Sequence, residues 1–195
     1  NSRNRVFVEN GDEVTIYPFD ESKVEDPSLI IYSPVKQVGS DIIVTNGDQT
    51  DTIEEYLQKG KCFRCALNTR TFEPDAPNYT PRISGILHLK KGGFTYEMSI
   101  LKSADGKGVK CNRFTFDYEP VNGVGHFIHT YEKDGNPLPT FEGEPERVAI
   151  PNDVNAFAEE IWQNLDANNK IALYVRAVNL RTWQSESVLI NKYQK

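Results

Sequence analysis

The feature that most constrains the fold is an alternating run of apolar and polar residues between Arg82 and Ile100. Apolar side chains recur at every second position on both sides of the Gly92-Gly93 step. A period of two residues is that of a β-strand, and a Gly-Gly step is typical of a hairpin turn. The pattern therefore predicts two antiparallel strands that meet at this turn.

Further strands are expected in pairs along the chain, each pair separated by residues typical of turns or loops. The predicted pairs are residues 6–8 with 14–17, 29–38 with 41–45, 114–118 with 126–131, and 171–180 with 187–193. Paired short strands of this kind predict sheets that are mostly antiparallel.

Helices are predicted in two regions. The first region holds a helix capped by Thr50 or Asp51, which ends near Gly60, and a second short helix over residues 62–70. The second region, capped by Asn152 or Asp153, has an apolar stripe over residues 154–165 that must pack against another element. Helices that each bury one face predict an α+β fold in which they cover the sheets.

Length and charge restrict the class of protein. The chain has 195 residues, of which 38% are hydrophobic, so we expect one domain over residues 1–195. There are 22 Lys and Arg residues against 28 Asp and Glu residues, a net charge of −6, which disfavours a nucleic-acid partner. No leader and no apolar run of the roughly 20 residues that span a membrane is visible, so a soluble, cytoplasmic protein without a membrane partner is expected.

The cysteines are Cys62, Cys65 and Cys111, an odd number that fits a reducing compartment. The CxxC motif has no second pair, and the three histidines show no ligand spacing. Ordinary helix-packing cysteines are therefore favoured over a metal or redox site, and no metal ion is expected.

Two segments are denser in polar groups than their predicted structure requires. Residues 45–52 lead from a strand into a helix start, where free backbone N–H groups can receive an anion or a carbonyl oxygen. A plain turn with a helix cap explains this segment equally well. In residues 72–82, Pro74, Pro77 and Pro81 stiffen a loop that carries two carboxylates, an amide and a guanidinium, which favours a site over a rigid connector.

Together these segments resemble motifs of the archaeal-type IMP cyclohydrolases. In that family a Tyr-bearing strand precedes a Thr/Ser-Asn-Gly-x-x-Thr-Asp-Thr-Ile turn and an acidic loop that ends in Asn-(x)-Thr-Pro-Arg-Ile. The matching positions are Tyr32, residues 45–53, residues 73–83 and Asn4-Arg5, the last of which corresponds to an Asn-Arg after the family's first strands. The resemblance covers roughly the first 85 residues and then only fragments such as residues 130–132. Because the family has strands before the Asn-Arg, we expect further residues upstream of Asn1.

The resemblance implies a fold and an activity. The fold is the four-layer αββα sandwich of the N-terminal-nucleophile hydrolases, without their catalytic N-terminal residue. The activity is that of an IMP cyclohydrolase, the dehydrative ring closure of 5-formamidoimidazole-4-carboxamide ribonucleotide to IMP. A purine ribonucleotide is then the small-molecule partner, no cofactor is needed, and a homo-oligomer is expected.

Ring closure requires groups that orient the substrate, move protons and stabilise charge on the formyl oxygen. The catalytic residues that the resemblance implies are Glu73 for proton transfer, Tyr32, and Asp75 as an orienting group. The substrate-binding residues that it implies are Asn4, Arg5, Asn46, Asp48, Thr50, Asn78, Thr80 and Arg82. Arg5 and Arg82 supply forked, permanently charged donors for the phosphate or carboxamide.

The two carboxylates of the loop resist ionising together, which raises the pKa of Glu73, whereas a nearby Arg82 opposes that rise. Two other functions stay open at this point. An amide-bond hydrolase of the same fold would need a nucleophile, and a catalytically silent purine-nucleotide-binding protein would keep the pocket alone.

Overall fold

The computed structural model describes residues 3–24 and 31–193 of the chain. Its strands are β1 (Arg5–Asn10), β2 (Glu13–Pro18), β3 (Val35–Val38), β4 (Asp41–Thr45), β5 (Arg82–Lys90), β6 (Gly93–Ser103), β7 (Cys111–Tyr118), β8 (Val124–Phe127), β9 (Glu146–Ala149), β10 (Ala172–Val178) and β11 (Ser185–Asn191). Its helices are α1 (Gln49–Gln58), α2 (Phe63–Leu67) and α3 (Val154–Asn164), with a 3-10 helix at Glu21–Lys23. The fold is α+β with antiparallel sheets, as predicted.

Strands β1 to β7 form one sheet in chain order, and β8–β9 and β10–β11 are separate antiparallel pairs. The predicted central hairpin is confirmed: β5 and β6 pair from Arg82 opposite Leu101 to Lys90 opposite Gly93. Gly92 lies at the turn with φ 76°, a conformation that glycine adopts without steric cost. The predicted first and last hairpins are confirmed as β1–β2 and β10–β11.

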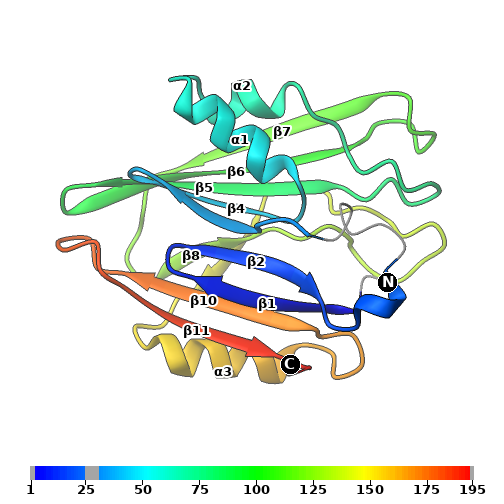
Figure 1. Ribbon diagram of the computed structural model, residues 1–195. Helices are drawn as coiled ribbons and strands as arrows, with labels where there is room; N and C mark the ends of the chain where they lie inside the picture. Colours follow the sequence, from blue (N-terminus) through cyan, green and yellow to red (C-terminus); the bar gives the residue numbers. More distant parts are fainter. Residues whose placement is uncertain (1–2, 25–30, 194–195) are drawn as a thin grey trace.

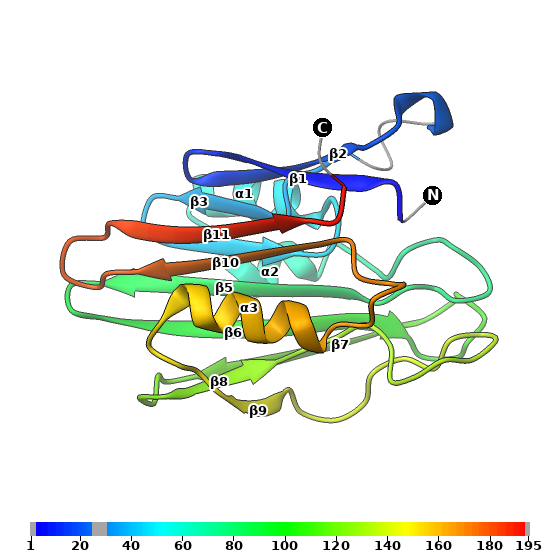
Figure 2. The same ribbon diagram turned by 90° about the horizontal axis from the view of Figure 1, so that it is seen from below.

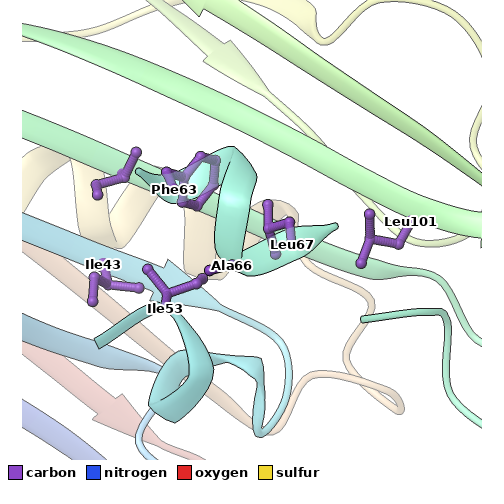
Figure 3. Packing of buried hydrophobic residues seen from close by; sticks show 7 residues of the cluster. Ile43, Ile53, Phe63, Ala66, Leu67 and Leu101 are labelled. Carbon is purple, nitrogen blue, oxygen red and sulfur yellow. The ribbon is translucent and has the colours of Figure 1, made fainter. Parts of the chain in front are cut away.

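Helices α1 and α2 lie on one side of β4 to β7, whereas α3 lies on the opposite side of the molecule, against β10 and β11 (Figure 1). Ile43 of β4, Ile53 of α1 and Phe63 of α2 pack together, and each is at most 1% exposed (Figure 3). Burying an aliphatic or aromatic side chain stabilises a fold by about 1.5–3 kcal/mol. This cluster therefore fixes α1, and with it the turn at its start, to the sheet.

The opposite face of the sheet contributes a second cluster, with Val14, Val35, Ile42 and Leu89 at its centre. The β10–β11 pair is fastened beside β1, because the Asn191 amide donates to the Phe7 carbonyl at 2.9 Å and accepts from its N–H at 2.8 Å. Figure 2 shows this pair between β1–β2 on one side and β8–β9 on the other.

The predicted pairing of residues 114–118 with 126–131 is wrong. Among the described residues, the one strand that pairs with β7 is β6. Strand β8 pairs instead with β9, for example His126 with Arg147. Alternation along a strand predicts which residues share a face but not which strand lies beside it. Here Pro120 and the tight turn from Val121 to Val124 lead the chain away from the edge of β7.

The strand predicted over residues 29–38 is shorter in the structure, where β3 begins at Val35. Leu29 and Ile30 lie outside the described residues. Tyr32 lies in an irregular segment before β3, and its backbone carbonyl accepts a hydrogen bond from Ile16 N–H at 2.9 Å. Pro34 has no N–H to donate, which accounts for a ladder that starts after it.

The helix starts also differ in part from expectation. Helix α1 begins at Gln49 after Asp48 at the N-cap, so the prediction that Thr50 or Asp51 caps it is wrong. The Thr50 side chain contacts the turn before the helix, and the Asp48 carboxylate makes no capping hydrogen bond because it contacts Arg70 and Arg82. Helix α2 covers only part of the predicted residues 62–70. Helix α3 is confirmed with Asp153 as its cap, which accepts from Ala156 N–H at 2.8 Å.

Cys62 and Cys65 form a disulfide, with Cα atoms 5.1 Å apart, so the expectation of unpaired packing cysteines is wrong. The reason lies in the backbone: Cys62 is extended (φ −88°, ψ 160°) rather than helical. Its side chain therefore turns over the first turn of α2 towards Cys65.

Within residues 3–24 and 31–193, no helix has the length and apolar character needed to cross a membrane.

Ile86 provides a test of the core that carries α1 and α2. It is fully buried in the same cluster as Ile53 and Phe63, so Ile86→Ala is expected to lower the free energy of unfolding by about 2–5 kcal/mol in urea denaturation. Val109→Ala, at a position 77% exposed, serves as the control and should change it by less than about 0.5 kcal/mol. Equal effects of the two changes would contradict this account of the core.

Candidate active site

The turn between β4 and α1 is held by hydroxyl groups inside the protein. Thr45 and Thr50 are buried, and their hydroxyl oxygens lie 2.6 Å apart. Both also lie within hydrogen-bond distance of the Gly47 carbonyl, at 2.8 and 3.2 Å. Because each hydroxyl has one hydrogen, one of them donates to this carbonyl and the other donates to its neighbouring hydroxyl. The Thr50 hydroxyl, which the resemblance assigned to the substrate, is thus used within the turn.

Asn46 joins this turn to the start of β5. Its amide donates to the Pro81 carbonyl at 2.9 Å and accepts from Ile83 N–H at 2.9 Å and from the Gln49 amide at 3.1 Å. Its own carbonyl accepts from the Tyr32 hydroxyl at 2.7 Å. The turn, the strand and the segment around Tyr32 are therefore brought to one place, as the sequence predicted for Tyr32 and Asn46.

Arg82 is the cation on which the polar groups converge. It is only 6% exposed, and its guanidinium makes a two-pronged contact with the Glu73 carboxylate at 2.8 and 3.1 Å. The same group donates to Asp48 at 2.5 Å and to the Gln49 side-chain oxygen at 2.8 Å. A forked guanidinium thus fixes a carboxylate from the acidic loop against the start of α1.

Gly47 lies directly against this contact. A methyl group there would come within 2.6 Å of Gln49 Oε1, 2.7 Å of Arg82 Nη1 and 2.9 Å of Glu73 Oε1. Those separations are shorter than the van der Waals contact distance between a carbon atom and an oxygen or nitrogen atom. Only a hydrogen atom fits, so the glycine is required for the guanidinium to reach both partners.

Asp48 is shared between two arginines. Its second carboxylate oxygen accepts from Arg70 at 2.6 Å, while the first accepts from Arg82. Burial alone would raise the pKa of Asp48, but the two guanidiniums outweigh it and hold the pKa below its usual value. Asp48 therefore stays ionised as the anionic partner of this pair.

Glu73 has the opposite balance. Burial is the largest influence and raises the pKa of Glu73; Arg82 opposes it, and the negative charges of Asp48 and Asp75 add to the rise. The resulting pKa lies above the usual 4.5. A carboxyl group in this state exchanges a proton more readily near neutral pH than a solvated glutamate does.

Tyr32 lies close enough to sense this charge. Burial raises the pKa of Tyr32, Arg5 lowers it, and the charge on Glu73 raises it further. Its phenol is therefore protonated at neutral pH, and its one hydrogen is donated to the Asn46 carbonyl. Arg5 lies beside it, with a buried Nε that has no hydrogen-bond partner among the described residues.

Several other predicted site residues are used to shape the loops. The Asn4 side-chain amide donates to the Asp20 carbonyl and accepts from the Asp20 N–H, both at 2.8 Å, and so fixes the backbone there. Asp75 accepts from the N–H of Thr80 at 2.6 Å and from the hydroxyl of the same residue. Asn78 accepts from Leu138 N–H at 3.1 Å.

Three residues were missed in the sequence. Gln49 and Arg70 contact Arg82 and Asp48, and Tyr131 contacts Thr80. Gln49 lies within the matched turn, and its position directly after the helix cap is a signal that could have identified it. Arg70 and Tyr131 reach the site from other segments. Tyr131 lies in the matched fragment 130–132, which is a signal that could have identified it, whereas no local pattern marks Arg70.

A cavity of about 490 Å³ lies on the face of the sheet opposite to α1 and α2. Asn46 and Thr45 line it at one end, and Tyr96, His126 and Ile150 line it elsewhere. Its walls are mainly apolar, and its size is that of small-molecule sites. Asn46 is thus a wall shared by this cavity and the polar cluster.

In the described part of the chain no group of three or more His, Cys, Asp or Glu side chains has an arrangement that would hold a metal ion.

Comparison with known proteins gives the following matches. A family model described as "IMP cyclohydrolase-like protein" matches residues 1–182. IMP cyclohydrolases from the archaea Methanocella arvoryzae and Methanococcus maripaludis are 35% and 37% identical over 89 residues, 43% of this chain and 44% of each relative. That from Haloquadratum walsbyi is 31% identical over 88 residues, 43% of this chain and 45% of the relative. The aligned parts thus span less than half the length of these relatives.

Gly47→Ala tests the close approach at the centre of the site. The added methyl group is expected to displace Arg82 or Glu73 and to lower the free energy of unfolding by about 1–3 kcal/mol, as overpacking of a fixed site does. Gly93→Ala, where the new methyl group meets nothing within 4 Å, is the matched control. Thermal and urea denaturation measure both; a Gly47→Ala protein as stable as the Gly93→Ala protein would disprove the steric requirement.

Proposed function

The chain belongs to the IMP cyclohydrolase-like protein family, and we propose that it is an IMP cyclohydrolase that closes 5-formamidoimidazole-4-carboxamide ribonucleotide to IMP. The observation that carries this proposal is the convergence of Glu73, Tyr32 and Arg82 beside the turn at Gly47. These are a carboxyl group with a raised pKa, a protonated phenol and a buried cation, the group types that a dehydrative ring closure requires.

The finer fold and organisation are part of the same proposal. We propose that the helices and strands form the four-layer αββα sandwich of the N-terminal-nucleophile hydrolases, within one domain over residues 1–195. The positions of α1 and α2 on one side and α3 on the other support it (Figure 1). A cytoplasmic location and a homo-oligomeric assembly are proposed with it, on the basis of the family.

The proposed reaction needs no group beyond the substrate and the protein. The carboxamide nitrogen forms a bond to the formyl carbon, and the formyl oxygen leaves as water. The two protons of that water come from the carboxamide nitrogen and the formamido nitrogen. The protein must therefore accept a proton from a weakly acidic amide and return one to the departing oxygen.

We assign these proton transfers to Glu73. Its ionised form accepts the proton of the carboxamide nitrogen, and its raised pKa lets it hold that proton and deliver it to the formyl oxygen. It then accepts the proton of the formamido nitrogen and delivers it to the leaving hydroxyl group. The Tyr32 hydroxyl, in the same cluster, is the candidate donor to the formyl oxygen as negative charge develops there. For this it exchanges its hydrogen bond to the Asn46 carbonyl for one to the substrate. Asp75 acts by shaping the loop rather than by reacting.

The substrate phosphate is assigned to Arg5. Arg82 is already surrounded by Asp48, Gln49 and Glu73, so its role in the proposal is to orient Glu73 and to face the carboxamide. Arg5 has an unsatisfied buried Nε among the described residues, and a guanidinium binds phosphate in a forked geometry. Asn4, Asn46, Asp48, Thr50, Asn78 and Thr80 stay proposed site residues, although most of their side chains are engaged in shaping the loops.

Glu73→Gln is the decisive variant for catalysis. It preserves the shape of the side chain but removes the titrating group, so kcat for IMP formation, followed by ultraviolet absorbance, should fall by about 100-fold or more while IMP binding is retained. The wild-type rate should fall as pH decreases through the pKa of Glu73, above its usual 4.5, because the base must be ionised. The variant should lack this acidic limb.

Glu159→Gln, at an exposed position on α3, is the matched control and should keep the wild-type rate. Wild-type turnover in Glu73→Gln would rule out the assignment of the proton transfer. A wild-type protein that binds IMP in calorimetry but forms none would instead identify a silent nucleotide-binding protein, and amide-bond cleavage without ring closure would identify a hydrolase.

Arg5→Ala tests the assignment of the phosphate. Loss of charge-assisted hydrogen bonds costs about 1.5–3 kcal/mol, so KM for the ribonucleotide should rise roughly 10- to 100-fold. Arg3→Ala is the control. Arg3 lies two positions before Arg5 and carries the same charge, but its side chain is exposed and contacts Asn169. An unchanged KM in Arg5→Ala would show that the phosphate binds elsewhere.

A further inference from the structure

Residues 130–141, here called the 130–141 arm, fold back on themselves after β8. Glu132 N–H donates to the Pro139 carbonyl at 2.9 Å, and Phe141 N–H donates to the Thr130 carbonyl at 3.0 Å. The returning end is anchored, because Phe141 is only 3% exposed and its carbonyl accepts from Lys102 of β6 at 2.8 Å. The arm is thus fixed to the large sheet.

The arm contacts the acidic loop at two points. The Tyr131 hydroxyl lies 2.5 Å from the Thr80 hydroxyl, and Leu138 N–H donates to Asn78 at 3.1 Å. These residues are 51 and 60 positions apart in the chain. The loop that carries Glu73 is therefore supported from outside as well as by Arg82 from within.

The hydrogen-bond directions at Thr80 are determined by its partners. The Thr80 hydroxyl has one hydrogen, which it donates to the Asp75 carboxylate. It must therefore accept from Tyr131. The Thr80 N–H donates to Asp75 at 2.6 Å, and its carbonyl accepts from Glu73 N–H at 2.9 Å. Through one residue, Tyr131 is connected to both carboxylate-bearing positions of the loop.

The surroundings of Tyr131 keep it a donor. Burial raises the pKa of Tyr131, the Thr80 hydroxyl lowers it, and the charges on Asp75 and Glu73 raise it. The influence of Glu73 also indicates that the phenol and this carboxylate lie in the same electrostatic environment. The phenol is therefore protonated at neutral pH and able to maintain the contact.

We propose that Tyr131 is a positioning residue for Glu73: its hydroxyl holds Thr80, and Thr80 in turn fixes the backbone of Glu73 and the carboxylate of Asp75. This inference rests on the function proposed above and adds a residue from a distant segment to its machinery. Tyr131 does not itself touch the reacting atoms in this assignment. Its contribution is to the alignment of Glu73 with the bound substrate.

Tyr131→Phe removes only the hydroxyl group. If Tyr131 aligns Glu73, kcat for IMP formation should fall about 10- to 100-fold, the loss that small misplacements of catalytic groups produce, while KM changes less than about threefold. Tyr118→Phe is the matched control, because it also removes a tyrosine hydroxyl. Tyr118 is the last residue of β7, and its hydroxyl contacts Glu144 at 3.3 Å rather than the acidic loop. Wild-type kcat in Tyr131→Phe would overturn the proposal.

A double-mutant cycle tests whether Thr80 is the route. Thr80→Val removes the linking hydroxyl, so the Tyr131→Phe change should have little further effect on kcat in that background. Thr80→Ser keeps the hydroxyl and should restore most of the rate. Multiplicative losses in the double variant would overturn the assignment to Thr80.

Amide hydrogen exchange separates this inference from the proposed function. In Tyr131→Phe the N–H groups of Glu73 and Thr80, which close the loop, should exchange about 10-fold faster or more, whereas those of β5 should not change. If the wild-type protein forms no IMP, the proposed function fails, and the exchange result still decides whether Tyr131 holds the loop. Unchanged exchange at both positions would overturn the proposal.

Discussion

The interaction on which the site depends is the burial of the Arg82 guanidinium. A cation removed from water must be paired and hydrogen-bonded, because its desolvation otherwise costs several kcal/mol. Arg82 obtains its acceptors from the turn before α1 and from the acidic loop, through Asp48, Gln49 and Glu73. Segments separated by more than 20 positions are thereby tied to the first residue of β5. The absence of a side chain at Gly47 is a direct consequence, since the guanidinium and its partners occupy that space.

The same cation places opposing demands on Glu73. It fixes the carboxylate through two contacts, and it also favours the ionised form, which would prevent Glu73 from carrying a proton. Burial and the charges of Asp48 and Asp75 act in the other direction, and the pKa of Glu73 is raised. Burial is the largest of these influences. Asp48 adds to it, because its negative charge lies next to Arg82 and is itself held ionised by Arg70. One carboxylate serves as a permanent counter-ion so that the other can titrate.

Much of the fold could be predicted because local patterns determine it. The Gly92-Gly93 step and the alternation around it predict β5–β6, and the stripe behind Asp153 predicts α3. The polar density of residues 45–52 and 72–82 also pointed to the place where Tyr32, Asn46 and Glu73 meet. The pairing of β8 with β9 could not be predicted, because periodicity specifies faces and not neighbours. The roles of Arg70 and Tyr131 could not be predicted either, although Tyr131 lies in the matched fragment 130–132, because their partners, Asp48 and Thr80, are 22 and 51 positions away.

The two supports of the acidic loop act on different atoms of Glu73. Arg82 holds the carboxylate, whereas the Thr80 carbonyl holds the backbone N–H. Fixing either end alone would leave the torsions of a long side chain free, and ordering such a chain costs about 1–2 kcal/mol in conformational entropy. Pro74 restricts the backbone on the remaining side, because the residue before a proline is confined to extended conformations. With both ends and the backbone restrained, the depth of the carboxylate is set by covalent geometry, and the entropy of ordering is lost on folding rather than on substrate binding.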